Sequence, residues 1–393
     1  MVYIAALGAV NSLGSNIANM RQSLAQNYNA PHHLTKKKGW ILNDESSWFG
    51  EADYPLSVIP DALQQFASRN NQLLYNAYLQ IKIEIEQIIA EYGQQRVAVI
   101  MGTSTSGIHE GDLAVKHYLQ TQTLPKHYTY NQQELGDPSC FLATLLGLQG
   151  PAYTISTACT SSARAIISGK RLIDAGIVDA AIVGGADSLS RMPINGFYAL
   201  DSISKMPCMP FSQDRNGINI GEASALFLLT KKESSDIAVL GTGESSDAHH
   251  ISAPHPDGTG AEKAMRMALH NASLNASDIG YINLHGTATE LNDLAESKAV
   301  YRLFQHTNTP CSSTKHLTGH TLGTAAATEL ALSYLLIEQK MKLPQQDFSI
   351  SPFDSKLDKI SIITHDMVLE KPLIMSNSFA FGGNNTSLII GKK

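Results

Sequence analysis

The stretch YTISTACTSSA, residues 153–163, is typical of a strand that turns sharply into a helix. Beyond it, Ile166, Ile167 and Ile173 continue an apolar face at helical spacing. Cys159 would therefore lie near unpaired backbone N–H groups at a helix start, where an anion is favoured and a thiolate forms more easily. A nucleophile and a buried structural cysteine are about equally compatible with this stretch alone.

Two histidine segments further along the chain change this balance. YINLHGTAT, residues 281–289, places His285 at a strand end, followed by glycine and two hydroxyl side chains. SSTKHLTGHTLG, residues 312–323, places His320 after a glycine, at the start of a second helical run. A lone histidine is more often structural, so the two gain weight only together with Cys159.

Short apolar runs alternate with helical stretches along the whole chain, which predicts an α/β protein. We expect buried strands at four such runs: residues 97–101, 180–183, 225–229 and 387–390. Residues 30–60 show no clear period and are interpreted as an excursion from the first half.

The two halves of the chain also resemble each other. IAALG at residues 4–8 is similar to IAVLG at 237–241, and two further pairs of segments follow in the same order: 97–103 with 281–287, and 153–175 with 311–338. Three pairs of similar segments in the same order predict an internal duplication. We divide the chain at the charged turn before residue 236, giving an N-terminal half of 1–235 and a C-terminal half of 236–393.

Composition narrows the class of protein. The chain has 393 residues, 43% hydrophobic and 16% charged, with a formal net charge of −6, which argues against a nucleic-acid partner. It contains no uncharged apolar run of the ~20 residues that a membrane span needs. The four cysteines lie far apart without a CxxC pair, which fits a reducing compartment and a cytoplasmic protein, and argues against structural zinc.

Four motifs occur together: TACTSSA (157–163), HGTATELND (285–293), KHLTGHTLGTAAATE (315–329) and NSFAFGGNN (377–385). In order and rough spacing they resemble the β-ketoacyl-acyl-carrier-protein synthases I and II, from the first strand to the C-terminus. The resemblance implies the thiolase fold, a duplicated five-layered α/β/α/β/α architecture. It also implies a decarboxylating Claisen condensation of an acyl thioester with malonyl-acyl carrier protein, giving 3-oxoacyl-acyl carrier protein.

The resemblance also assigns roles to residues around the nucleophile. Cys159 would take the acyl chain as a thioester, and His285 and His320 would stabilise the enolate formed on decarboxylation. Lys315 and Glu329 match the charged pair that tunes this site. The resemblance implies no metal and no cofactor, because the substrates arrive on the phosphopantetheine of the carrier protein.

Further matched positions concern the substrate. The backbone N–H groups of Cys159 and Phe381 would form the oxyanion hole, and Phe379 and Phe381 form an aromatic pair on the Gly382-Gly383 loop. Thr287 and Thr289 match the hydroxyls that hold the phosphopantetheine arm. Thr105 aligns with the loop that lines the acyl pocket, where its polarity favours a conjugated or short chain over a long saturated one.

The family works as a dimer, so we expect a homodimer or a heterodimer with a related ketosynthase-like chain. Arg69 falls where the family docks its acidic acyl carrier protein. The chain departs from the usual family residues at several positions, which suits a specialised synthase of polyenes or polyketides: Arg164, Met209, Asn216, Ala380 and Asn384.

Three alternatives remain open on the sequence. A thiolase would carry a second cysteine at the place of His320, and a chain-initiating synthase would carry asparagine there. A non-catalytic partner subunit of the chain-length-factor kind would lack Cys159. The intact Cys-His-His set favours the decarboxylating elongation class, including the active subunit of a ketosynthase/chain-length-factor heterodimer in aryl polyene or polyketide synthesis.

Overall fold

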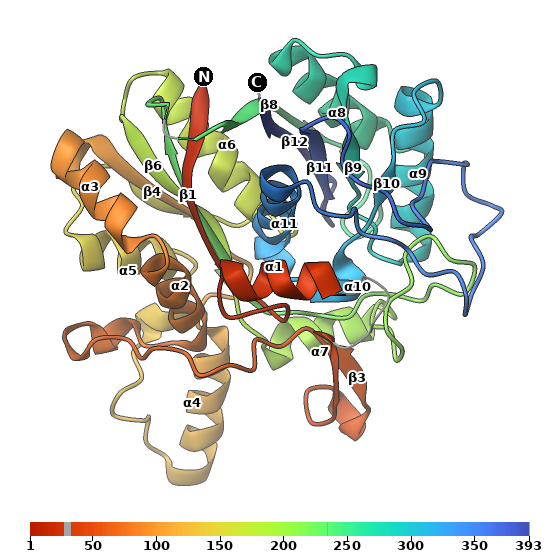
Figure 1. The fold of residues 1–393 in the computed structure, drawn as a ribbon. Helices are drawn as coiled ribbons and strands as arrows, with labels where there is room; N and C mark the ends of the chain where they lie inside the picture. Colours follow the sequence, from red (N-terminus) through yellow and green to blue (C-terminus); the bar gives the residue numbers. More distant parts are fainter. Residues whose placement is uncertain (27–32, 234, 393) are drawn as a thin grey trace.

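The computed structural model describes residues 1–26, 33–233 and 235–392 (Figure 1). Ten strands follow one hydrogen-bonded order, β10-β9-β11-β12-β8-β1-β7-β6-β4-β5. The first half of the chain supplies β1 (Val2–Val10), β4 (Val97–Gly102), β5 (Ala152–Ile155), β6 (Ala180–Asp187) and β7 (Ala223–Thr230). The second half supplies β8 (Ile237–Ser246), β9 (Tyr281–Asn283), β10 (Cys311–Ser312), β11 (Leu373–Phe379) and β12 (Asn384–Lys392).

The two halves have the same strand topology. If the strands of each half are numbered in chain order, both follow 3-2-4-5-1 across the sheet. The senses also agree: β4, β5 and β6 run parallel like β9, β10 and β11, while β7 and β12 are antiparallel to their neighbours. The predicted duplication is therefore confirmed, and each pair of similar segments falls on equivalent strands. The division at residue 235 lies in the link between β7 and β8 and stays a prediction as a domain boundary.

Helices form layers on and between the two half-sheets (Figure 1). Helices α2 (Arg69–Leu79), α3 (Lys82–Tyr92) and α5 (Asp137–Leu146) cover the outer face of the first half. Helices α8 (Thr259–Ala272) and α9 (Glu290–Phe304) cover that of the second. Between the halves lie α6 (Ser161–Asp174) and α11 (Ala325–Gln339), which pack on each other and on both sets of strands. The remaining helices are α1 (Ile17–Gln26), α4 (Ile108–Thr121), α7 (Arg191–Ala199) and α10 (Lys315–Thr318).

The central layer explains the composition of α11. Its sequence, AAATELALSYLLIEQ, is apolar or small on nearly all sides, and twelve of its residues are buried. A helix enclosed between two sheets has no solvent face, so it needs no amphipathic stripe. The largest buried cluster accordingly joins α6 and α11 with strands of both halves.

The predicted excursion is a small appendage on α7, and residues 30–32 of it lie outside the described residues. Strands β2 (Thr35–Lys37) and β3 (Ser47–Phe49) pair antiparallel. The turn between them is fixed to α7, since Asn195 donates to the Trp40 carbonyl at 3.0 Å and Tyr198 donates to Glu45 at 2.7 Å. This appendage therefore supports the segment that leads to the site described below.

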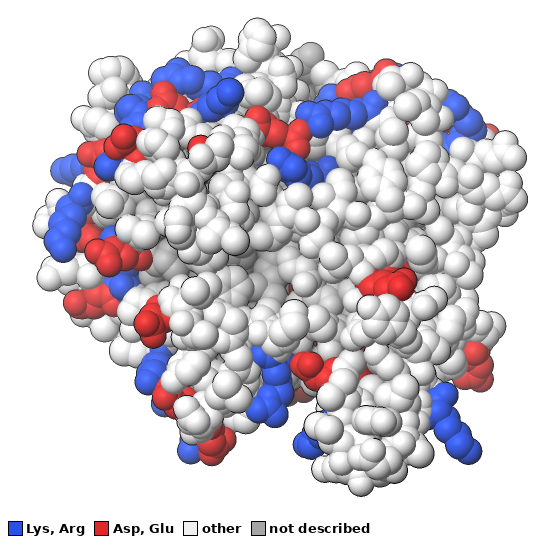
Figure 2. Space-filling view, turned by 180° about the vertical axis from the view of Figure 1, so that it is seen from behind, with Lys and Arg blue, Asp and Glu red and all other residues white. Residues whose placement is uncertain are grey.

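The surface has a mixed charge pattern. On the face in Figure 2, Lys and Arg side chains are interspersed with Asp and Glu near the rim, and a largely uncharged surface surrounds a central hollow. This pattern is unlike the continuous cationic surface that binds nucleic acid. None of the described helices has the length and apolarity to span a bilayer.

Candidate active site

Cys159 lies in a constrained turn between β5 and α6. Ala158 has φ +52°, a left-handed conformation that is unusual for a side-chain-bearing residue. The Ser161 hydroxyl holds this turn by donating to the Ala158 carbonyl at 2.6 Å and accepting from the Thr157 N–H at 2.9 Å. The predicted strand-turn-helix is present, with Cys159 two residues before the helix.

His285 directly follows the short strand β9, and a buried carboxylate fixes its backbone. Glu296 accepts hydrogen bonds from the N–H groups of His285, at 2.8 Å, and Gly286, at 2.7 Å. Gly286 has φ +39°, and a Cβ at this residue would meet Ser313 at 2.5 Å, so the turn requires glycine. The His285 side chain is thereby directed toward Cys159, and their polar atoms join those of His320 within 4.8 Å of one another.

The hydrogen bonds around the two imidazoles define their tautomers. His320 Nδ1 accepts from the Leu322 N–H at 3.1 Å, so a neutral ring carries its proton on Nε2, which lies 3.1 Å from Cys159 Sγ. His285 Nδ1 lies 3.4 Å from Lys315 Nζ, and its Nε2 is buried without a hydrogen-bond partner among the described residues. Both rings therefore present an Nε2–H to the space beside the thiol.

Burial and Lys315 keep both histidines uncharged. Burial lowers the pKa of His285 and of His320 well below the usual range, and the nearby Lys315 ammonium lowers both pKa values further. Lys315 itself is buried and bonded to Glu329. Burial raises the pKa of the Glu329 carboxyl to about 7, against the opposing effect of Lys315. The site thus holds two neutral hydrogen-bond donors next to a buried ion pair.

The prediction that Cys159 ionises easily is wrong for the free enzyme. The thiol is only 5% exposed, and burial raises its pKa to about 11. Lys315 and the backbone N–H groups of Phe381 and Cys159 lower this pKa but do not outweigh burial. Burial removes the water that would stabilise the thiolate, and this desolvation opposes the favourable electrostatics of the helix start.

The backbone N–H groups of Phe381 and Cys159 are those predicted for the oxyanion hole. Both lower the pKa of the Cys159 thiol. Phe381 packs against Phe197 with ring centroids 5.6 Å apart, and Phe379 packs against His285 at 6.2 Å. The loop that carries Phe381 includes Gly382, with φ +84°. The predicted aromatic pair is therefore next to the thiol and the histidines.

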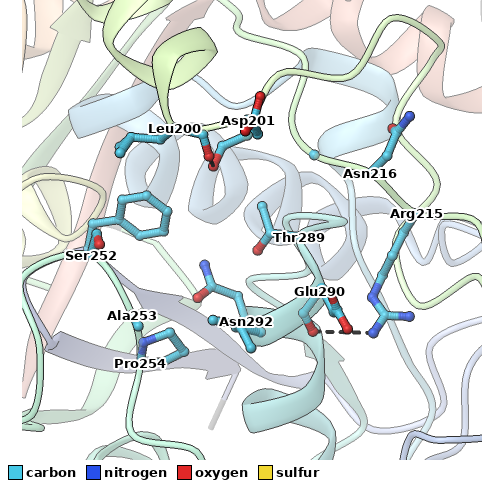
Figure 3. A pocket seen from close by; sticks show the side chains of 14 residues that line it. Leu200, Asp201, Arg215, Asn216, Ser252, Ala253, Pro254, Thr289, Glu290 and Asn292 are labelled. Carbon is cyan, nitrogen blue, oxygen red and sulfur yellow. Dashed lines mark hydrogen bonds between the residues drawn. The ribbon is translucent and has the colours of Figure 1, made fainter.

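Two adjacent cavities that share four lining residues lie next to the thiol and outside it. The inner cavity is lined by Cys159, His285 and His320 together with Thr287 and other side chains. The outer cavity, of about 470 Å³, is drawn in Figure 3 and opens to solvent. Four residues line both cavities and so form the neck between them: Ser202, Thr289, Asn292 and Phe381.

Of the threonines predicted from the resemblance to contact the substrate, two line the cavities and one does not. Thr287 and Thr289 face the cavities, and their hydroxyls bond each other at 2.9 Å. Thr105 lines neither cavity: its hydroxyl donates to the buried Asp187 at 2.9 Å. Its role in binding the acyl chain stays a prediction.

The contacts of Arg69 favour a structural role, and its predicted docking role stays a prediction. Its guanidinium donates to Glu222 Oε1 at 2.6 Å and to the Ala52 carbonyl at 2.8 Å. Glu222 is 3% exposed, so Arg69 serves to balance a buried carboxylate. The sequence shows a basic residue near the start of a helix but gives no sign of its distant partner.

Several residues of these cavities were not predicted from the sequence. Phe197, of the inner cavity, lies on α7, and Ser202, of the neck, follows that helix, where the sequence has no motif. Asn292 lies inside the HGTATELND motif. Its place at the neck was not predicted, because the sequence does not show which way the first turn of α9 faces.

Comparison with known proteins identifies the family of this chain. The family model for the β-ketoacyl synthase N-terminal domain matches residues 2–235, and that for the β-ketoacyl synthase C-terminal domain matches residues 237–349. A curated relative, 3-oxoacyl-[acyl-carrier-protein] synthase 1 of Buchnera aphidicola subsp. Baizongia pistaciae, is 30% identical over all of this chain and 99% of its own.

Solved structures show the same fold. A structure titled as the ketosynthase ApeO in complex with its chain length factor ApeC, from Xenorhabdus doucetiae, aligns with a TM-score of 0.96 and 54% identity, over 100% of this chain and 98% of the matched one. A β-ketoacyl synthase from Burkholderia phymatum aligns with a TM-score of 0.87 and 25% identity, over 100% and 99% of the two chains.

The chain belongs to the β-ketoacyl synthase family. Its thiolase-like fold and its class as a condensing acyltransferase, both predicted from the motifs, are confirmed.

Proposed function

We propose that this chain is the catalytic ketosynthase subunit of a heterodimer with a related ketosynthase-like chain, and that it elongates acyl chains held on an acyl carrier protein. The observation that carries the catalytic part is the convergence of Cys159 Sγ with two Nε2–H donors, one of them 3.1 Å away. The heterodimer is supported by the ketosynthase and chain-length-factor complex, which contains a chain 54% identical to this one.

The first half-reaction is transfer of the acyl group to Cys159. The sulfur attacks the acyl-carrier thioester, and the backbone N–H groups of Cys159 and Phe381 hold the oxyanion of the tetrahedral intermediate. The carrier thiolate then leaves and takes up the proton that Cys159 gives up. His320 Nε2–H donates to the sulfur and so stabilises its negative charge as it forms.

The second half-reaction uses the donors of both histidines. Loss of carbon dioxide from malonyl-acyl carrier protein leaves an enolate, whose oxygen lies between the Nε2–H groups of His285 and His320. The enolate carbon attacks the Cys159 thioester, forming the new carbon–carbon bond and releasing the Cys159 thiolate, which is then protonated. The product is 3-oxoacyl-acyl carrier protein.

This mechanism involves no metal and no cofactor of the enzyme. By type, Cys159, His285 and His320 would suit a metal ion. Each imidazole nitrogen that faces the site carries a proton in the tautomers above, however, and a protonated nitrogen has no lone pair for a metal. The only carried group is the phosphopantetheine of the substrates.

We place the enzyme in the cytoplasm. Its four cysteines are free, and three of them are buried, which suits a reducing compartment. We also propose that the enzyme elongates conjugated polyene chains, on the basis of its departures from the usual family residues at Arg164, Met209, Asn216, Ala380 and Asn384.

The half-reactions are separable by mutation. We expect Cys159→Ala to abolish acyl-enzyme formation and condensation while malonyl decarboxylation survives, because its oxyanion is held by the histidines. We expect His320→Ala or His285→Ala to retain acylation but to lower decarboxylation by roughly 10²–10³-fold, the usual cost of one oxyanion donor. Acylation is measured by intact-protein mass, and decarboxylation by carbon dioxide release from malonyl-acyl carrier protein.

Normal decarboxylation by His320→Ala, together with condensation by Cys159→Ala, would contradict the proposed roles. The subunit arrangement is tested separately by expressing the chain with and without a tagged chain-length-factor-like subunit from the same source. A stable, fully active homodimer would favour the second candidate, a homodimeric synthase.

A further inference from the structure

The neck between the two cavities holds a polar side chain that the mechanism does not use. Asn292 is the third residue of α9 and is 7% exposed. Its carboxamide bonds to no other described residue. Figure 3 shows this carboxamide pointing into the space bordered by Thr289, Ser252 and Ala253. The carboxamide faces the cavity and uses neither its NH₂ donors nor its carbonyl acceptor for a bond to a described residue, so both are available to a ligand in the neck.

The chemistry of the arm that must pass through this neck is complementary to the carboxamide. A phosphopantetheine thioester carries two secondary amides in series, and each offers one N–H donor and one carbonyl acceptor. Asn292 offers a carbonyl and an NH₂ group in one plane, so it can accept from such an N–H and donate to such a carbonyl. Asn292 is also uncharged, so it adds nothing to the negative charge of Asp201 and Glu290, which line the same outer cavity.

The order of residues along the path assigns one amide to Asn292. Thr287 lines the inner cavity, beside the thiol, whereas Asn292 lines both cavities and therefore lies further out. The amide closest to the sulfur then falls beside Thr287, and the second amide falls at the neck. Building on the proposed function, we infer that Asn292 binds the outer amide of the phosphopantetheine arm and so helps to select carrier-bound substrates.

Thioesters with different numbers of amides test this assignment. An acyl-N-acetylcysteamine thioester carries only the amide near the sulfur, whereas an acyl-pantetheine thioester carries both. Acylation of Cys159 by each is followed by intact-protein mass in the full-length wild type and in Asn292→Leu, which keeps the branched shape of the side chain but removes both hydrogen bonds. We expect the rate constant with acyl-pantetheine to fall about 10-fold and that with N-acetylcysteamine to change less than about twofold.

Two further variants make the outcome decisive. Asn292→Asp keeps an acceptor but loses the NH₂ donors, so it should also discriminate against acyl-pantetheine, and thermal unfolding reports whether either variant is misfolded. Asn131→Leu, at an exposed residue that lines neither cavity, is the matched control and should leave both rates unchanged.

Equal loss with both thioesters would show that Asn292 acts on the structure of the site, and no loss with either would remove it from substrate binding. If the wild type itself were acylated by neither thioester, the proposed function would fail together with this inference. Wild-type acylation with unchanged variants would overturn the inference about Asn292 alone.

Discussion

At Cys159, burial and positive charge act on the thiol in opposite directions, and burial is the larger effect. The reactive thiolate is therefore a minor species at neutral pH in the free enzyme. Substrate binding supplies what the free site lacks, because the carrier thiolate that leaves the tetrahedral intermediate accepts the proton that Cys159 gives up. The small thiolate fraction of the free thiol lowers its reactivity toward adventitious alkylation.

This balance predicts the pH dependence of Cys159 alkylation. Because its pKa is raised to about 11, the thiolate fraction should increase about tenfold per pH unit from pH 7 to pH 10, without a plateau. Brief pulses of iodoacetamide followed by peptide mass analysis at Cys159 measure this rate. A plateau below pH 9 would show that Lys315 and the two N–H groups outweigh burial after all.

The limits of sequence reasoning are clear at single residues. Cys159, His285 and His320 were found because their types and order carry the chemistry, and the structure brings them together within 4.8 Å. The pKa of Cys159 and the surroundings of Thr105 were not predictable, because both depend on groups that are distant in the sequence. The sign of a pKa shift depends on how much water is excluded, and no local motif encodes that.

At the scale of elements, one ion pair joins the start of helix α2 to the residue before strand β7. Arg69, the first residue of α2, bonds Glu222, which precedes β7 and also accepts from the Ala52 N–H at 3.1 Å and the Leu189 N–H at 3.3 Å. The carboxylate therefore joins several segments, and the guanidinium balances its charge. The sequence predicted the strand at residues 225–229 but neither helix α2 nor this cross-link.

We expect Arg69→Glu to lower the free energy of unfolding by about 3 kcal/mol, because it leaves two carboxylates facing each other at a buried position. Breaking a buried pair costs about 3–5 kcal/mol, and the 28% exposure of Arg69 favours the lower value. Urea unfolding followed by circular dichroism measures the change. The double variant Arg69→Met, Glu222→Leu should recover most of the loss, since it leaves no unpaired charge.

A different result would favour the docking role of Arg69. Unchanged stability of Arg69→Glu, with weaker and less salt-sensitive association with the acyl carrier protein, would mean that the guanidinium is available at the surface despite its bond to Glu222.

At the scale of the whole molecule, buried titratable groups make stability depend on pH in two opposite ways. Burial raises the pKa of Glu296 to about 8, so the folded protein keeps a proton that the unfolded chain has already released. Its effect is therefore a loss of stability as pH rises from about 4.5 to about 8. His285 and His320 act the other way, because their lowered pKa values cost stability below pH 6.5, where the unfolded chain is protonated.

The free energy of unfolding should therefore fall between pH 7 and pH 8.5, because most of the histidine effect is complete by pH 7 and the effect of Glu296 is the larger one above it. Urea unfolding at constant ionic strength across this range tests the sign. Glu296→Gln removes the titrating group, so its stability should vary less with pH over the same interval. A wild-type stability that rises from pH 7 to pH 8.5 would show that Glu296 is ionised in the folded protein.

The two halves have the same strand order but differ at their outer edges. The edge of β10 is covered, because Cys311 donates to the Ser361 carbonyl at 2.9 Å and accepts from the Ile363 N–H at 3.0 Å. On the described part of the chain, no strand or bridge pairs with the outer edge of β5, where Ala152 and Tyr153 are exposed. An open edge strand is a site for pairing with another chain, so we expect the partner subunit to bind along β5.

Proline at this edge tests the arrangement. The register of β5 on β4 directs the Thr154 and Ala152 N–H groups away from β4, so they are free to bond a partner strand. Ala152→Pro removes one of these donors without breaking a bond inside the chain, because Ala152 is exposed and follows a proline. We expect Ala152→Pro to raise the dissociation constant of the dimer at least tenfold, as measured by mass photometry, while Cys159 is still acylated by a small thioester.

Ala152→Thr, which keeps the N–H and favours an extended strand, is the control and should dimerise normally. If Ala152→Pro dimerised as well as Ala152→Thr, the partner would have to bind through another surface, and the open edge of β5 would need a different explanation.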